Sequence, residues 1–286
     1  METVEEVQST TAEPRADDSI RIQPGSYLLE LSLDWIVLRA SENIHHLLRE
    51  SHVTLIDEPL GRFVHAQALH DLRNLFSRLS GTTGVARVYA VRLTDEHELV
   101  DVAFQLIDGR VLLEIVPSAG CFGECFGTVA GLIGGLSDAQ GQVLLDGGAR
   151  RMRALTGYDR VTLKCGDQRA ESSRGAFAAP SSIPNDVPVI VCDRDGRSVP
   201  VFPRAVEETS VAGALLRCCS EDQRSQLERE GVRSSLRVPF SVDGISGEFR
   251  CESRSKREPS FELHAAAELF AQLFAMRLEI DGLKNR

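Results

Sequence analysis

Residues 215–242 read LLRCCSEDQRSQLEREGVRSSLRVPFSV, and this stretch predicts a short amphipathic helix that runs into a β-strand. Ser220 is the predicted N-cap of the helix, and Gly231 ends it. An Asp-Gly pair at 243–244 then predicts a hairpin turn, with residues 245–251 as the return strand. Apolar residues lie on one side of the helix (Leu216, Leu227 and Val232) and alternate along the first strand (Leu236, Val238 and Phe240).

Composition is that of an ordinary folded protein. The chain has 286 residues, of which 42% are hydrophobic, and its formal net charge is −10. This length predicts two domains of common size, and the negative charge argues against a broad surface for nucleic acid or for anionic membranes. Six acidic residues lie among residues 1–18, a polar segment without apolar periodicity that predicts a disordered tail.

Several functional classes find no support in the sequence. It has neither an apolar leader nor an apolar run of 18 residues, so we expect a cytoplasmic protein whose seven cysteines are reduced. No set of Cys and His residues has the spacing of a metal site, and no nucleophile or phosphate-loop motif accompanies the histidines. The sequence therefore predicts no metal site and no catalytic residues.

The first 120 residues have the pattern of an antiparallel sheet flanked by helices. The predicted strands span residues 27–33, 36–40, 86–93, 99–106 and 111–116, and the predicted helices span residues 43–49 and 69–79. Turn signals separate the last three strands. The order of two strands, two helices and three strands is typical of a PAS domain.

Three segments resemble bacterial phytochromes. Residues 22–48, IQPGSYLLELSLDWIVLRASENIHHLL, resemble the signature IQPHG and the strands that follow it, although Gly25 stands where the signature has histidine. Residues 150–164, RRMRALTGYDRVTLK, resemble the junction that leads into the family's GAF domain. Residues 215–242 resemble the part of that GAF domain that surrounds a biliverdin chromophore.

The resemblance covers residues 19–283 and implies an α+β fold in which a PAS domain precedes a GAF domain, each an antiparallel sheet flanked by helices. It also implies a figure-of-eight knot between residues 19–26 and 199–214, with Ile20 and Ile22 as an apolar plug. It does not extend to the family's PHY or output domains. The expected units are a disordered acidic tail (1–18), a PAS domain (19–120), a connecting helix (121–149) and a GAF domain (150–286).

Two long helices are predicted in the second half of the chain. Residues 121–156 predict a helix whose glycines favour a break, or a close helix contact, at residues 134–137. Residues 261–283 predict an amphipathic terminal helix with more apolar positions than one stripe needs, so we expect it to pack on its own domain and on a second copy of the chain. The expected dimer interface consists of Leu269, Leu273, Phe274 and Ile280.

The resemblance implies a bilin pocket in the GAF domain, and some of its positions are kept. Arg217 and Ser220 match family positions that face a propionate group, and Ser235 is retained. Ile183 and Pro184 match the end of the family's SDIP motif. If the pocket still holds a ligand, the resemblance makes these residues, together with Gln223 and Glu252, the ones that contact it.

Other pocket positions depart from the family. Gln223 and Glu252 replace two histidines, and the change from histidine to Gln223 removes a titratable group from the pocket. The departures introduce charges at Lys164, Arg237 and Glu252. We expect these charges to pair with one another and to leave a collapsed or polar core in place of the cavity. The further departures are Ser182 for the aspartate of SDIP, Gln226 for a tyrosine, Lys164 for an aromatic residue and Arg237 for a small hydroxyl residue.

The resemblance implies no covalent bilin anchor. Bacterial phytochromes attach biliverdin through a cysteine upstream of IQPHG, and this sequence has no cysteine before Cys121. Plant and cyanobacterial relatives use a GAF cysteine whose place is taken by Asp222. Cys218 and Cys219 lie about one helical turn earlier and are weak candidates for the same role.

These features predict a phytochrome-like regulatory protein that has lost covalent biliverdin binding, needs no cofactor, and acts through dimerisation or through a regulatory protein partner. The alternative is a sensor whose GAF pocket binds biliverdin non-covalently, or another small carboxylate ligand, as a residual photoreceptor does. An enzyme is the least favoured class, because the histidines are scattered and lack catalytic partners in the sequence.

Overall fold

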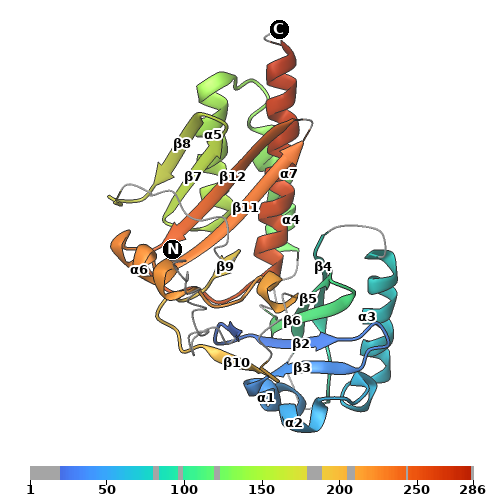
Figure 1. Ribbon diagram of the computed structural model, residues 1–286. Helices are drawn as coiled ribbons and strands as arrows, with labels where there is room; N and C mark the ends of the chain where they lie inside the picture. Colours follow the sequence, from blue (N-terminus) through green and yellow to red (C-terminus); the bar gives the residue numbers. More distant parts are fainter. Residues whose placement is uncertain are drawn as a thin grey trace, which may run out of the picture.

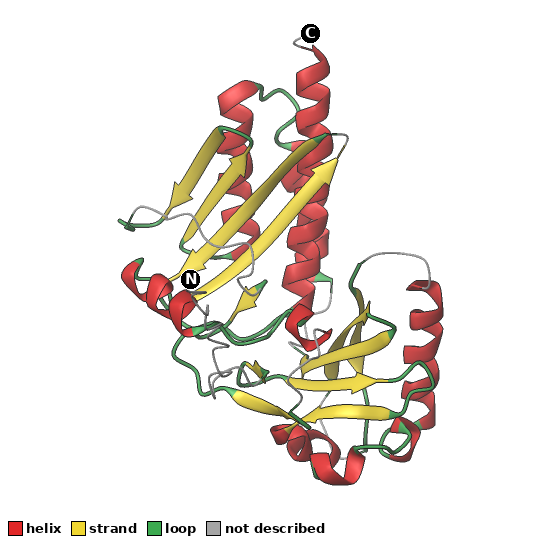
Figure 2. Ribbon diagram, in the orientation of Figure 1, coloured by secondary structure: helices red, strands yellow, loops and turns green. Residues whose placement is uncertain are grey.

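The computed structural model describes residues 20–79, 84–95, 99–118, 123–178, 189–204, 210–242 and 244–284. These residues form two antiparallel sheets with helices packed against them (Figures 1 and 2), so the predicted α+β class is confirmed. The predicted acidic tail and the site candidates Ile183 and Pro184 lie outside the described residues. Among the described helices, none is long and apolar enough to cross a bilayer.

The first sheet has seven strands in the order β1-β10-β3-β2-β6-β5-β4. Alternating apolar side chains of its strands form a core with Trp35 and with Leu72 of helix α3. The predicted strands and the helix expected at 69–79 are present, whereas helix α2 has no counterpart among the predicted elements. The elements are β1 (Arg21–Ile22), β2 (Tyr27–Leu31), β3 (Val37–Ser41), α1 (His45–Leu48), α2 (His52–Leu55), α3 (Ala66–Leu79), β4 (Ala86–Val91), β5 (Val100–Ile107), β6 (Arg110–Pro117) and β10 (Val199–Phe202).

The second sheet has five strands in the order β8-β7-β12-β11-β9, and helices α5 and α7 cover one of its faces (Figure 1). Phe240 and Phe249 meet Phe270 and Phe274 of α7, with ring centroids between 5.3 and 6.3 Å apart. A Cβ atom on Gly148 of α5 would lie 2.4 Å from the Phe274 ring, so glycine permits this close helix contact. The elements are α5 (Gly141–Thr156), β7 (Arg160–Cys165), β8 (Gln168–Ser173), β9 (Ile190–Val191), β11 (Ser234–Val242), β12 (Ile245–Ser253) and α7 (Phe261–Lys284).

The helix predicted at 121–156 is two helices. Helix α4 spans Glu124–Gly134 and α5 begins at Gly141, so the predicted break is confirmed. The turn between them is held from outside, because the buried Arg277 of α7 donates hydrogen bonds to its backbone. The accepting carbonyl groups are those of Leu136, Ser137 and Ala139.

Strand β10 returns from the second half of the chain to the first sheet, where it lies between β1 and β3 (Figure 1). Strand β1 pairs with it through Arg21 and Ile22, and the Gln23 amide that follows donates to the Leu216 carbonyl at 2.9 Å. Ile22 is 1% exposed and packs with Val201 and Ala214. The expected contact between residues 19–26 and 199–214 is therefore present, and sheet membership does not follow the boundary expected at residue 150. The threading of a knot stays a prediction.

Candidate functional site

The stretch 215–242 folds as predicted, with helix α6 (Glu221–Arg229) leading into the β11–β12 hairpin. Ser220 caps the helix, because its Oγ accepts a hydrogen bond from the Gln223 amide at 3.3 Å. In return, Gln223 Oε1 accepts from the Ser220 amide at 2.9 Å. This capping box satisfies two backbone donors at the helix start. Both candidate ligand residues are thus engaged with the backbone of their own helix.

The second sheet has two chemically different faces. Along β12, Phe249 and Cys251 belong to the apolar core, and Arg250 and Glu252 alternate with them on the opposite face. Glu248 belongs to this opposite face as well. The strand register places five more residues beside them: Ser235 and Arg237 of β11, and Arg160, Thr162 and Lys164 of β7. We call these eight residues the polar face.

Four buried charged side chains form an ionic cluster at the polar face: Arg160, Arg250, Glu230 and Glu252. Arg160 Nε donates to Glu252 Oε2 at 2.6 Å, and Arg250 pairs with both glutamates. The Arg160 and Glu252 side chains are at most 1% exposed. Glu230 is the C-cap residue of α6, so the cluster ties that helix to the sheet.

Mutual pairing is what allows these charges to lie inside the protein. Two positive and two negative groups give the ionic cluster a formal charge of zero, whereas a lone buried charge is costly. Burial raises the pKa of Glu252, and the guanidinium groups of Arg250 and Arg160 oppose that rise. Arg160 also donates to the Ala178 carbonyl at 2.5 Å and lies 4.6 Å from the centroid of the Phe177 ring.

The expected pairing among Lys164, Arg237 and Glu252 is wrong. Glu252 pairs inside the ionic cluster, Arg237 pairs with Glu248 at 2.5 Å, and Lys164 is exposed. The strand register is the reason, because Arg237 lies opposite Arg250 and diagonal to Glu248. A polar interior is present at this face, with partners that differ from the predicted ones.

Arg217 lies before α6, and its backbone contacts Ile22 and the buried Gln23. Its backbone pairs with Ile22 in an isolated bridge, and its carbonyl accepts from Gln23 Nε2 at 3.1 Å. Gln23 Nε2 also donates to the Ile190 carbonyl, and Gln23 Oε1 accepts from the Cys192 amide at 2.6 Å. The polar contact between β1 and β9 therefore rests on Gln23, the second residue of the IQP signature.

The weak anchor candidates Cys218 and Cys219 are half-buried. Burial raises the pKa of Cys218 to about 12 and that of Cys219 to about 11. Cys219 packs against Leu227 and Val232, which are apolar. Because the thiolate is the reactive form of cysteine, these surroundings disfavour either residue as a nucleophile for a covalent ligand.

Glu114 of β6 holds the segment that precedes α6. Its carboxylate oxygens accept hydrogen bonds from the backbone amides of Leu215 at 2.9 Å and Leu216 at 2.8 Å. The residue is 2% exposed, and burial raises its pKa from the ordinary 4.5 to about 7, although the two amides oppose the rise. The sequence signalled no role for Glu114, because it lies within an apolar run without a motif.

The residues of the ionic cluster other than Glu252 were not among the expected site residues. One sequence signal bears on them: charged and apolar residues alternate along 160–164 and 248–252, which is the pattern of a strand with one polar face. The expected pocket residue Ser235 is 2% exposed and lies directly opposite Glu252. The structure therefore brings Ser235 and Glu252 together, while Ser220 and Gln223 serve the helix cap.

No protein-family model matches this chain, and no curated protein matches it in sequence. Its fold does match solved structures. The chromophore-binding domain of an unusual bacteriophytochrome, RpBphP3 from R. palustris, is 24% identical with a TM-score of 0.71, over 92% of this chain and 96% of that one. The wild-type chromophore-binding domain of Stigmatella aurantiaca phytochrome P1 is 24% identical with a TM-score of 0.71, over 92% and 98%.

The match extends to part of a longer structure. The S. aurantiaca phytochrome photosensory core module is 24% identical with a TM-score of 0.73, and this chain covers 58% of its length. At this identity the comparisons establish the fold alone. The chain has the α+β fold of bacteriophytochrome chromophore-binding domains, and the PAS–GAF fold predicted from the sequence is confirmed.

We predict that Glu252→Gln lowers the free energy of unfolding by about 3 kcal/mol, because it leaves Arg160 and Arg250 with one buried carboxylate between them. Urea denaturation measures the change. The matched control is Glu248→Gln on the same strand, which breaks a pair whose carboxylate is 29% exposed and should cost about 1 kcal/mol or less. Equal losses in the two variants would contradict a special role for the buried cluster.

The raised pKa of Glu114 predicts a pH-dependent stability. The folded chain holds the proton more tightly than the unfolded one, so this contribution is complete below about pH 4.5 and is lost as the pH rises through about 7. Glu114→Gln should lower stability overall, since one amide loses its acceptor, and should remove a slope of up to about 1.4 kcal/mol per pH unit. Denaturation between pH 5 and 8 tests this, and the exposed Glu221→Gln should keep the slope.

Proposed function

We propose that this chain is a phytochrome-like regulatory module that acts through protein–protein contact, as a homodimer formed along helix α7, and that it does not hold a bilin covalently. The observation that carries the proposal is a solvent-exposed apolar stripe on α7. The arrangement of the polar face and the surroundings of Cys218 and Cys219 support the proposal that no bilin is bound covalently. No catalytic role is proposed.

The exposed stripe on α7 has the spacing of a coiled-coil seam. Leu269, Met276, Ile280 and Leu283 are between 42% and 61% exposed, and Leu273 is partly buried. Successive members of this set are four, three, four and three residues apart, which is the spacing of a and d positions in a heptad. A second copy of the same helix would cover the stripe by isologous packing.

The expected dimer interface needs one correction. Phe274 is fully buried in the aromatic cluster against the second sheet, so it does not face a partner. Helical geometry is the reason, because Phe270 and Phe274 lie one turn apart on the face opposite the stripe. Leu269, Leu273 and Ile280 remain interface candidates, and Met276 and Leu283 join them.

The polar face supports the loss of covalent biliverdin binding. The family resemblance implies a pocket histidine at the position of Glu252, and here Glu252 is paired within an ionic cluster whose charges are balanced. No cysteine precedes Cys121 in the sequence, and burial raises the thiol pKa of Cys218 and Cys219. A covalent bilin thus lacks an anchor upstream of the IQP signature in this sequence, and the two weak candidates in the second domain are poor nucleophiles.

One observation favours the alternative, a sensor that binds a tetrapyrrole or another carboxylate ligand without a covalent bond. The Thr162 hydroxyl is buried on the polar face and has no hydrogen-bond partner within the described part of the chain. A buried hydroxyl without a partner is costly, and a bound ligand would satisfy it. This candidate function keeps Ser235 and Arg217 as ligand residues.

If α7 forms the dimer, size-exclusion chromatography with light scattering should give twice the chain mass of 31.4 kDa. Met276→Glu combined with Ile280→Glu should yield monomers, because two carboxylates would face each other across the seam. The control is Val53→Glu on α2, which adds a charge at a residue that is 72% exposed and lies away from α7. A wild-type monomer, or a dimeric double variant, would refute the interface.

Mixing the purified protein with biliverdin separates the two functions. We expect no bilin fluorescence on the denatured protein in a gel containing zinc, because burial disfavours the thiolate forms of the candidate anchors Cys218 and Cys219. We also expect no red absorption band that changes under illumination. A reversible red or far-red band would support the sensor instead, and in that case Ser235→Ala should weaken the band whereas Ser172→Ala on the edge strand β8 should not.

A further inference from the structure

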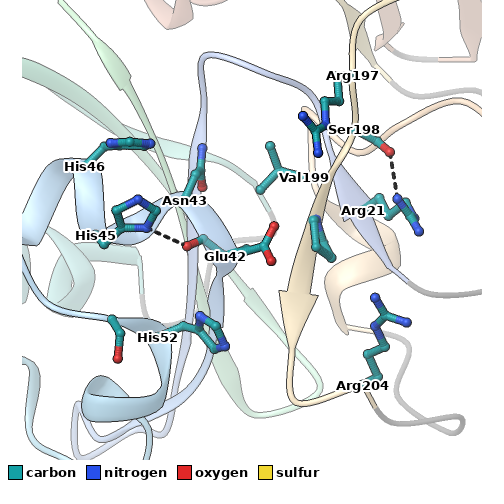
Figure 3. A pocket seen from close by; sticks show the side chains of 12 residues that line it. Arg21, Glu42, Asn43, His45, His46, His52, Arg197, Ser198, Val199 and Arg204 are labelled. Carbon is teal, nitrogen blue, oxygen red and sulfur yellow. Dashed lines mark hydrogen bonds between the residues drawn. The ribbon is translucent and has the colours of Figure 1, made fainter.

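A pocket of about 550 Å³ lies between the two halves of the chain, away from the polar face (Figure 3). One wall comes from residues 42–52, around α1 and α2, and the other comes from Arg21 and residues 197–204. Its volume is in the range of small-molecule sites. Because strand β10 supplies one wall, the pocket exists only through the return of the chain to the first sheet.

One half of the pocket is cationic. Arg21, Arg197 and Arg204 line it, and Glu42 is the one carboxylate in the lining, so the formal charge is three minus one, or +2. This local charge contrasts with the −10 of the whole chain. Arg21 Nη1 donates to Ser198 Oγ at 3.0 Å, and the Arg204 guanidinium lies 5.2 Å from the centroid of the Phe202 ring. Guanidinium groups gathered in this way bind the oxygens of phosphate groups well.

The other half of the pocket offers hydrogen-bond acceptors and flat rings. His45 Nδ1 lies 2.9 Å from the Glu42 carbonyl oxygen, which can only accept, so Nδ1 carries the hydrogen. In the neutral ring, Nε2 is then an acceptor, and the Glu42 carboxylate is another. The His52 ring stacks on Phe202, with 4.7 Å between centroids. Figure 3 shows the imidazoles and the arginines on opposite sides of Val199.

We propose that this pocket binds an organic phosphate of the nucleotide class. Its phosphate groups lie against Arg21, Arg197 and Arg204, and its sugar hydroxyls donate to Glu42 and His45. An inorganic anion would leave the acceptors unused, and a neutral sugar would leave the arginines unused. A metal is not the match, because the described residues contain no group of three or more His, Cys, Asp or Glu side chains arranged to hold one.

Isothermal titration calorimetry with ADP, inorganic pyrophosphate and adenosine tests the proposal. ADP should bind more tightly than either of the others, because it alone uses both halves of the pocket. Arg197→Ala combined with Arg204→Ala should weaken both ADP and pyrophosphate by about tenfold or more. His45→Ala should weaken ADP and leave pyrophosphate unchanged.

The exposed Arg169→Ala on β8 is the matched control, and it should bind ADP as the wild type does. The unfolding midpoint shows whether each variant folds, and the single exposed Arg197→Ala replaces the double variant if the latter does not. The proposal is overturned if ADP gives no heat at millimolar concentration, if the arginine variants bind ADP as well as the wild type, or if pyrophosphate binds as tightly as ADP.

Discussion

The ionic cluster of two arginines and two glutamates determines how the second domain closes around its polar face. Glu230 ends helix α6 and Arg160 begins strand β7, so the pairing of these charges through Arg250 and Glu252 draws distant parts of the chain to one place. Such a cluster is stable only when its members are complete, because any one charge left alone in a dry interior is costly. The C-terminal end of α6, the paired strands and the segment that carries Phe177 all meet at this cluster.

Buried polar contacts join the two domains, in addition to the apolar packing of Leu112 with Ala214 and of Ala103 and Val116 with the core of the second sheet. Glu114 accepts hydrogen bonds from two backbone amides ahead of α6. The Gln23 side chain, which follows β1, accepts a hydrogen bond from the Cys192 amide next to β9. On the other side, Arg87 of β4 contacts His264 and Glu268 of α7 at 2.9 and 2.8 Å. Both walls of the proposed phosphate pocket come from the first sheet and the segments beside it, although they lie in different halves of the chain.

Helix α7 has one face in the core of the second sheet and another face exposed on the surface. One of its faces supplies the aromatic cluster and the Arg277 contacts that hold the turn before α5. The opposite face carries the exposed stripe, so any partner on that stripe is coupled through a rigid helix to the sheet that bears the ionic cluster. The proposed function depends on this division of one helix between core and interface.

The sequence by itself determined the local elements, because alternation, capping and turn residues act over a few positions: Ser220, Gly231 and the 236–240 pattern define α6 and the hairpin without help from elsewhere. It also identified the fold, through motifs that keep their packing residues. Only the tertiary structure decided that Glu252 pairs with Arg160, because the register of β12 against β7 brings together two residues that lie 92 positions apart in the sequence. The burial of Phe274 was also decided by the tertiary structure, because it depends on which face of α7 packs against the sheet. Glu114 and the arginine pocket could not be predicted, because the residues that they bring together lie about 100 positions or more apart in the sequence.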